Sequence, residues 1–256
     1  MKPLLRVAEL GKRFGARTAV ADVGFDLYAG EVLGIVGESG SGKTTLLRML
    51  SGQLTPDQGR VEFTARDGEQ LDLYALPEFR RRLLMRTDWG YVHQQARDGL
   101  RLAVSAGANI GERLMAQGDR HYGRIRDEAI DWLQRVEMPA ERIDEAPTTF
   151  SGGMQQRLQI ARNLVTRPRL VFMDEPTASL DVSVQARLLD LLRQLVAELQ
   201  LAVVLVTHDL AVARLLAHRL LVMKDGRVVE AGLTDQVLDD PQHPYSQLLV
   251  SSVLQA

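Results

Sequence analysis

Residues 32–44 read VLGIVGESGSGKT, and this stretch decides the fold of the chain. Its first five residues are continuously apolar, which is typical of a strand buried on both faces. Residues 37–44 fit G-x-x-x-x-G-K-[ST], in which glycines let the backbone curl into a cradle of N–H groups for phosphate oxygens. The sequence therefore predicts a strand, a phosphate-binding loop and a helix from Lys43 to about Leu50. A glycine-rich turn without a ligand is the alternative, and Lys43 and Thr44 argue against it.

The rest of the chain alternates between strand and helix patterns. We expect strands at 5–10, 23–28, 31–36, 60–64, 88–93, 170–173 and 202–207, helices at 182–199, 210–217 and 244–254, and an Asp-Gly hairpin within 220–230. Such alternation with crossovers predicts a mostly parallel, helix-covered sheet. Apolar residues at three- and four-residue spacing predict a helical block at about 95–165, inserted in one α/β domain that spans residues 1–256.

Composition narrows the class of protein. The chain has 256 residues with a formal net charge of −2, so no overall field draws it to nucleic acid or membrane. It has no cysteine, which excludes disulfides and is consistent with a reducing cytoplasm. No segment approaches the roughly 18 apolar residues of a membrane span, and no signal peptide is evident. We expect a soluble, cytoplasmic protein without direct membrane insertion and without nucleic acid as a partner.

Polar residues end three of the expected strands. Asp174 and Glu175 follow an apolar strand, where Asp174 suits a Mg²⁺ role and Glu175 suits a general base that polarises the attacking water. His208 follows the next such strand and can hydrogen-bond a γ-phosphate or that water. Gln94 offers a neutral oxygen to Mg²⁺ and the water, and the Thr44 hydroxyl can also bind Mg²⁺. A helix-capping turn, a solvated histidine and a surface glutamine are the alternatives.

Two further residue groups point to nucleotide. Ser151, Gly152 and Gly153 can start a helix whose N–H groups offer a second phosphate site. Since the phosphate loop already supplies one such site, the chain carries two half-sites, and a complete catalytic site needs two copies of the fold. Phe14, in an early turn, can stack on adenine or belong to the core.

These motifs, in this order and spacing, resemble the ABC-type ATPase domain over essentially the whole chain. The resemblance implies an ABC ATPase fold with an N-terminal antiparallel β subdomain and an inserted helical subdomain. It also implies ATP and Mg²⁺ as cofactors, and head-to-tail packing against a second ABC ATPase domain. Asp181 would lie in a loop that communicates across that interface. The implied nucleotide contacts are Phe14, Gly37, Glu38, Ser39, Gly40, Ser41, Gly42, Lys43, Thr44, Thr45, Ser151, Gly152, Gly153, Gln155 and Asp181; the implied metal ligands are Thr44, Gln94 and Asp174; the implied catalytic residues are Glu175, His208 and Gln94.

The resemblance can be narrowed further. Phe150 and Met154 replace the Leu and Gln usual in the family signature, as in the peptide/nickel importers, which also end in His-Pro-Tyr like residues 243–245. Residues 96–101, however, lack the Pro-rich segment of those importers. Residues 104–115, 121–123 and 248–254 are similar to the ATP-binding subunits of the bacterial phosphonate carbon–phosphorus lyase system. This similarity implies docking on a soluble multi-subunit lyase core, whose bond-breaking chemistry would belong to the partner.

Other functions stay open from the sequence. An importer ATPase would share every catalytic residue, and only the helical block, the partner-facing surface in this family, distinguishes it from the lyase subunit. A DNA-repair or chromosome-type ABC ATPase would carry a long coiled coil between the phosphate loop and Ser151, and no heptads occur there. A nucleotide-binding scaffold would require Glu175 and His208 to be idle.

Overall fold

The computed structural model describes residues 2–253, which form two compact units. The first unit combines the chain up to residue 81 with the chain from residue 200 onward, and the second covers residues 82–199. The predicted helical block at 95–165 falls within the second unit, which also contains two strands and a long helix. The single-domain organisation stays a prediction. Met1, and Leu254 at the end of the predicted last helix, lie outside the described residues.

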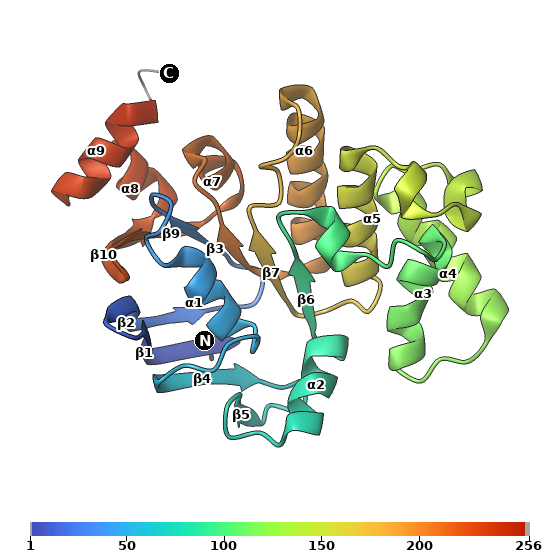
Figure 1. The fold of residues 1–256 in the computed structure, drawn as a ribbon, viewed down its shortest axis with the longest axis horizontal. Coiled ribbons are helices and arrows are strands. Elements are labelled where there is room, and N and C mark those ends of the chain that lie inside the picture. The colour runs from blue at the N-terminus through green and yellow to red at the C-terminus, as the bar shows by residue number, and fades with distance from the viewer. Residues whose placement is uncertain (1, 254–256) are drawn as a thin grey trace. The chain divides into compact units, whose positions relative to one another are not determined.

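The first unit begins with an antiparallel sheet. Its strands are β1 (Leu5–Phe14), β2 (Arg17–Leu27), β4 (Gln58–Thr64) and β5 (Gln70–Asp72), in the order β2-β1-β4-β5 (Figure 1). This sheet confirms the predicted N-terminal β subdomain. Strand β1 continues beyond the predicted 5–10, whereas β2 begins before the predicted 23–28 and ends one residue earlier. Register shifts interrupt their pairing, and Glu9 and Asp22 have a φ of 53°. Such irregular residues break the apolar alternation on which the prediction depended.

A second group of strands in the first unit holds the phosphate loop. Strand β3 (Val32–Val36) pairs in parallel with β8 (Ala202–Val206) and with β9 (Arg219–Lys224). The predicted hairpin joins β9 to β10 (Arg227–Leu233), and Asp225 and Gly226 both take positive φ, as a tight two-residue turn requires. All five residues of β3 are buried, as its apolar run predicts. The helices here are α1 (Lys43–Leu50), α7 (Leu210–Leu216), α8 (Thr234–Asp239) and α9 (Pro244–Val253).

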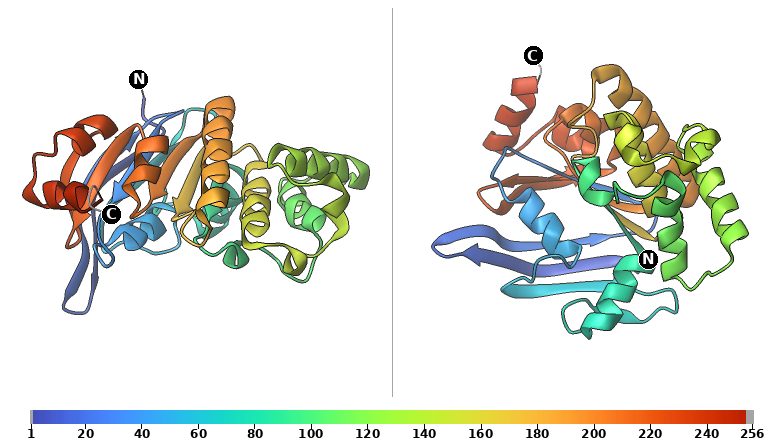
Figure 2. Two further views of the ribbon diagram at one scale, coloured as in Figure 1. Left: turned by 90° about the horizontal axis from the view of Figure 1, so that it is seen from above. Right: turned by 45° about the vertical axis from the view of Figure 1, so that its right-hand side comes forward.

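The second unit pairs two parallel strands, β6 (Trp89–Val92) and β7 (Leu170–Asp174). Helix α2 (Glu78–Thr87) crosses its boundary, and α3 (Ala106–Ala116), α4 (Tyr122–Arg135), α5 (Gly152–Leu164) and α6 (Val182–Leu199) follow, with short 3₁₀ turns at 96–99, 140–144 and 147–149. Helices α3, α4 and α5 contact one another, and Figure 2 shows them as one helical group. Their core includes Ile110, Trp132 and Leu158.

No helix within residues 2–253 combines the length and the apolar character needed to cross a membrane.

Candidate active site

The phosphate loop of the first unit depends on glycine at two places of close backbone approach. Gly37 and Gly42 take φ values of 146° and 106°, which strain residues with a side chain. A Cβ at Gly37 would lie 2.2 Å from the carbonyl oxygen of Met223, and one at Gly42 would lie 2.3 Å from that of Ala19. Helix α1 begins directly after Gly42, so the N–H groups of its first turn belong to this loop.

Lys43 is 5% exposed, and its ammonium group stays within the loop. It donates to the carbonyl oxygens of Gly37 and Glu38, each at 2.7 Å. Glu38 and its neighbours Ser39 and Gly40 are exposed, whereas Ser41 is buried. Thr44 and Thr45 follow in the first turn of α1, with Thr44 exposed and Thr45 half-buried. The loop thus presents backbone N–H groups and one positive charge together, which is the composition of a phosphate site.

His208 lies in the same unit as the phosphate loop, beyond the end of a neighbouring strand. Ile35 of β3 lies opposite Val206 of β8, and the Thr207 N–H donates to the Ile35 carbonyl oxygen at 3.2 Å. The two parallel strands therefore end at one edge of the sheet. His208 is exposed there, and Asp209 caps α7 by accepting from the Ala211 N–H at 2.8 Å.

In the second unit, two predicted catalytic residues, Gln94 and Glu175, lie close together just after the ends of β6 and β7. Val92 of β6 lies opposite Met173 of β7, so the residues that follow both strands emerge side by side. The Gln94 side-chain amide donates to the Glu175 carboxylate at 3.2 Å. Glu175 has a φ of 45°, an uncommon value for a residue with a side chain. This hydrogen bond orients the carboxylate and leaves the amide oxygen of Gln94 as the acceptor.

Buried amide side chains of α5 hold the strand that precedes Gln94. Gln159, fully buried, accepts from the His93 N–H at 2.6 Å and donates to the His93 carbonyl oxygen at 3.2 Å. Asn163 accepts from the Tyr91 N–H at 3.0 Å. Neither residue was predicted from the sequence to be functional. The signal that would have found them is a row of amides, Gln156, Gln159 and Asn163, at three- and four-residue spacing on an apolar helix.

Helix α5 starts at the predicted second phosphate site. Ser151 caps the helix by accepting from the Met154 N–H at 3.3 Å. Ser151 and Gly152 are exposed, and no atom lies within 4 Å of a Cβ built on Gly152. At Gly153 such a Cβ would lie 2.6 Å from the Val184 side chain. The N-terminus of α5 is therefore open at its first residue and closely packed one residue later.

Phe150 and Met154, the two residues that differ from the usual family signature, both contact Arg142. Its guanidinium lies 4.6 Å from the centroid of the Phe150 ring and donates to the Met154 sulfur at 3.3 Å. Arg142 is held by Glu145 at 2.6 Å. The two unusual residues therefore belong to the support of the Ser151 turn, and Ser151, Gly152 and Gly153 are unchanged.

The remaining predicted contacts lie in different surroundings. Gln155 is buried, and its amide donates to the carbonyl oxygens of Pro147 and Phe150 at 2.8 and 3.2 Å, so it supports the Ser151 turn. Asp181 is exposed just before α6. Phe14 is 52% exposed, which excludes the core alternative, and the Lys12 ammonium group lies 5.7 Å from the centroid of its ring.

The predicted magnesium ligands fit the ion in kind. Mg²⁺ prefers oxygen ligands, keeps several waters and binds through one or two protein groups with substrate phosphates. Thr44 offers a hydroxyl in the first unit, while Gln94 and Asp174 offer an amide oxygen and a carboxylate in the second. Among the described residues, no group of three or more His, Cys, Asp and Glu forms a closed metal site. The donors suit a cation shared with phosphate, as the resemblance implies.

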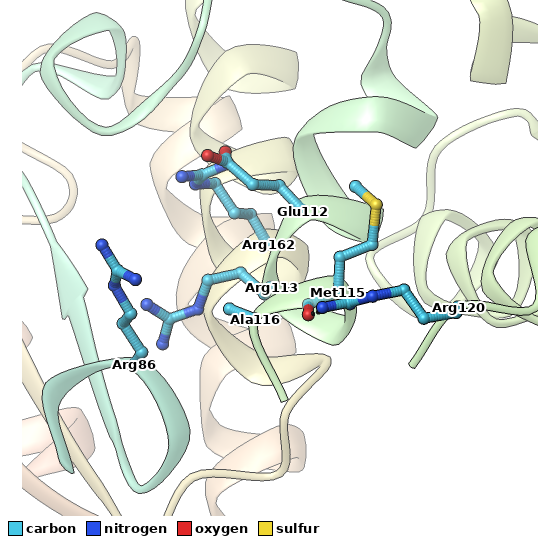
Figure 3. A pocket seen from close by; sticks show the side chains of 7 residues that line it. All are labelled: Arg86, Glu112, Arg113, Met115, Ala116, Arg120 and Arg162. Carbon is cyan, nitrogen blue, oxygen red and sulfur yellow. Dashed lines mark hydrogen bonds and ion pairs between the residues drawn. The ribbon is translucent and has the colours of Figure 1, made fainter. Parts of the chain in front are cut away.

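A positively charged pocket of about 500 Å³ lies in the second unit at α3 and α5 (Figure 3). It is lined by Arg86, Glu112, Arg113, Met115, Ala116, Arg120 and Arg162. Arg162 pairs with Glu112 at 2.7 Å, and Arg113 donates to the Trp89 carbonyl oxygen at 2.7 Å. Burial and then the charge of Arg162 lower the pKa of Arg113 to about 10. The lining carries four guanidinium groups and one carboxylate, and this excess of positive charge favours an anionic group from outside.

A glycine-built phosphate loop, a serine-capped helix with an open glycine and an acid pair after a buried strand define an ABC-type ATPase. The chain belongs to the ABC transporter family, whose model matches residues 20–178. The predicted resemblance and fold are therefore confirmed, and the class is ATP-hydrolysing.

Relatives and solved structures agree with this class. The chain is 69% identical over 254 residues to the phosphonates utilization ATP-binding protein PhnK of Escherichia coli (strain K12), covering 99% of both chains. It is 37% identical to the dipeptide transport ATP-binding protein DppD of the same organism, covering 98% of this chain and 78% of that protein. The fold matches CbiO1 of Clostridium perfringens, part of an ABC transporter complex, with a TM-score of 0.81 and 27% identity. The match covers 94% of this chain and 92% of CbiO1. It also matches a dimeric post-hydrolysis state of the ATP-binding cassette MJ0796 bound to ADP and Pi, with a TM-score of 0.79 and 29% identity. The match covers 90% of this chain and 98% of MJ0796.

Proposed function

We propose that this chain is the ATP-hydrolysing subunit of a phosphonate carbon–phosphorus lyase system, acting in the cytoplasm. The observation that carries the proposal is the 69% identity to PhnK along 99% of both chains, against 37% to DppD. The catalytic motifs would serve both functions equally. The difference in identity extends beyond those motifs and favours the lyase system over a peptide importer.

ATP binding and hydrolysis would divide between the two units. In the first, Lys43 and the backbone of the loop bind phosphates, and His208 contacts the γ-phosphate or the attacking water. In the second, Glu175 accepts a proton from that water as general base, and Gln94 holds its carboxylate in position. Thr44 of the first unit, and Gln94 and Asp174 of the second, would be the ligands of a magnesium ion, which when bound would neutralise charge at the phosphates.

We propose that the complete site needs a second ABC ATPase domain. The open N-terminus of α5 supports this, because Ser151 and Gly152 are exposed and a Cβ built on Gly152 would meet no atom within 4 Å outside its chain neighbours and the nearby helix backbone. Neither Lys43→Ala nor Ser151→Arg chains alone should hydrolyse ATP, while a mixture restores one composite site in each heterodimer. A mixture that forms heterodimers, shown by differently tagged chains, and still lacks activity would contradict a site shared between two chains.

The partner would be the soluble lyase core, which would bind the ATPase through the helices of the second unit. The arginine-lined pocket supports a docking surface for an acidic segment of that partner, since its positive lining exceeds its single carboxylate. The test is to recover the tagged chain from cells with its partners, with and without Mg-ATP. Co-purification with soluble lyase subunits supports the proposal, and co-purification with integral membrane subunits favours the importer.

Charge reversal sharpens this test. Arg86→Glu places a carboxylate in the pocket, whereas Arg66→Glu makes the same change in the first unit, outside it. The first variant should lose co-purification while keeping ATP hydrolysis, and the second should keep both. Equal recovery of both variants would show that the partner docks elsewhere.

A further inference from the structure

The phosphate loop is bonded to the C-terminal part of the chain, a contact that the catalytic roles do not use. Tyr245 lies in the first turn of α9 and is 5% exposed. Its hydroxyl oxygen accepts a hydrogen bond from the Glu38 backbone N–H at 2.9 Å. Glu38 is the second residue of the loop, and 207 positions separate the two residues. The start of the loop is therefore attached to a helix from the other end of the sequence.

The backbone of Glu38 also leads directly to Lys43. The Glu38 carbonyl oxygen accepts from the Lys43 ammonium group at 2.7 Å and from the Ser41 N–H at 3.2 Å. The N–H of the same residue is taken by Tyr245. A displacement of Glu38 would therefore move an acceptor of the charge that opposes the phosphates. Tyr245, Glu38 and Lys43 form a continuous chain of hydrogen bonds from α9 to that charge.

Tyr245 is itself held in place from two directions. The Lys224 ammonium group lies 4.8 Å from the centroid of its ring. Just before α9, the Glu230 carboxylate accepts from the backbone N–H groups of Gln242 and His243 at 2.8 and 3.0 Å. Burial raises the pKa of Tyr245, so its hydroxyl is neutral at neutral pH. The position of the tyrosine is thus fixed by the surrounding structure.

The hairpin between β9 and β10 supports the same loop. The Gly226 N–H donates to the Ser41 carbonyl oxygen at 2.9 Å, and Gly37 packs closely against the Met223 carbonyl group. These are backbone contacts that any sequence with the same turn would make. Tyr245 is different, because its contribution depends on one hydroxyl group that a substitution can remove alone.

We propose that Tyr245 is a positioning residue for nucleotide binding, which fixes Glu38 and through it Lys43, so that the affinity for nucleotide depends on the docking of α9. It acts through the loop and does not touch the reacting atoms. The proposal requires only that the phosphate loop binds nucleotide, and it is independent of the partner protein.

The test is Tyr245→Phe in the full chain, which keeps the ring, its burial and its contact with Lys224. We expect ADP to bind about three- to tenfold more weakly by titration calorimetry, the size of effect that loss of one hydrogen bond gives. The KM for ATP should rise by a similar factor, while kcat at saturating ATP stays within about twofold. An ADP affinity equal to that of the wild type would overturn the proposal.

Tyr74→Phe is the matched control. Tyr74 belongs to the same unit, and its hydroxyl donates to the carbonyl oxygens of Met49, in the last turn of α1, and of Leu54, just after that helix (2.8 Å to the latter). Its loss should lower the melting temperature and leave the ADP affinity unchanged. If both variants weaken ADP equally, the effect is a general loss of stability, and the positioning role is wrong.

Discussion

The N-termini of α1 and α5 both carry glycines and short hydroxyl side chains, but they differ in how their own chain surrounds them. At the start of α1, a Cβ on Gly42 would lie 2.3 Å from a backbone oxygen, and Lys43 is buried in the loop. At the start of α5, Gly152 is exposed and has no neighbour within 4 Å of such a Cβ. The glycine at the start of α1 packs against the backbone of its own unit, whereas the first glycine of α5 is exposed. The difference teaches that similar glycine-rich signals can mark a complete binding loop or one half of a shared site.

The largest expected effect tests whether the second unit supplies the chemistry. Glu175→Gln removes the proposed base and keeps the shape of the side chain, so turnover should fall by at least about 100-fold. ATP binding should persist, and an ATP-bound dimer should accumulate in size-exclusion chromatography. Hydrolysis within a few-fold of the wild type would show that the catalytic base lies elsewhere.

The sequence was sufficient for features in which chemistry and local pattern coincide. The loop at 37–44, the strand before it and the acids at the end of β7 were all predicted, because each depends on neighbouring residues. Helix α2 was missed, since its stretch EFRRRLLMRT buries only Leu84 and has almost no apolar periodicity. The hydrogen bonds from Gln94 to Glu175 and from Glu38 to Tyr245 join residues 81 and 207 positions apart, and no local pattern encodes such pairings.

A pair of glycine substitutions tests the difference between the two helix ends directly. Gly42→Ala forces a methyl group against a backbone oxygen at a positive φ, which should cost roughly 1–3 kcal/mol of stability and abolish ADP binding. Gly152→Ala meets no atom of its own chain, so stability should be unchanged or rise by up to about 1 kcal/mol. Its effect should be limited to ATP-driven dimerisation and turnover.

Thermal unfolding and ADP titration of both variants provide the measurement. The comparison fails if Gly152→Ala is destabilised as much as Gly42→Ala, because the N-terminus of α5 would then be enclosed as well. It also fails if Gly152→Ala hydrolyses ATP normally, because an open helix end without a role in turnover would be ordinary surface.

A smaller effect is expected from the buried amides of α5. Gln159→Met keeps the unbranched shape of the side chain but removes the amide group that bonds to the N–H and carbonyl groups of His93. We expect a loss of about 1–3 kcal/mol in the free energy of unfolding and a several-fold lower turnover, since the strand leading to Gln94 loses support. The ADP affinity of the first unit should not change. Gln134→Met, at an exposed position on α4, is the control, and weaker ADP binding in Gln159→Met alone would contradict the separation of roles.

The smallest effect is expected from Glu230, whose carboxylate accepts hydrogen bonds from the backbone just before α9 in the first unit. Burial would raise the pKa of Glu230, but the hydrogen bond from the Gln242 N–H and others to the carboxylate outweigh it, and the pKa is lowered. A carboxylate with a lowered pKa stabilises the fold above its unfolded pKa of about 4.3, and this stability is lost as the pH falls through the folded value. Glu230→Gln should therefore cost up to about 1 kcal/mol in urea unfolding at pH 7, and the difference from the wild type should shrink as the pH falls below about 4.3. Glu141→Gln, exposed in the second unit, should show no such difference. If Glu230→Gln also weakens ADP binding slightly while Glu175→Gln does not, nucleotide affinity depends on the C-terminal support of the first unit and catalysis on the second.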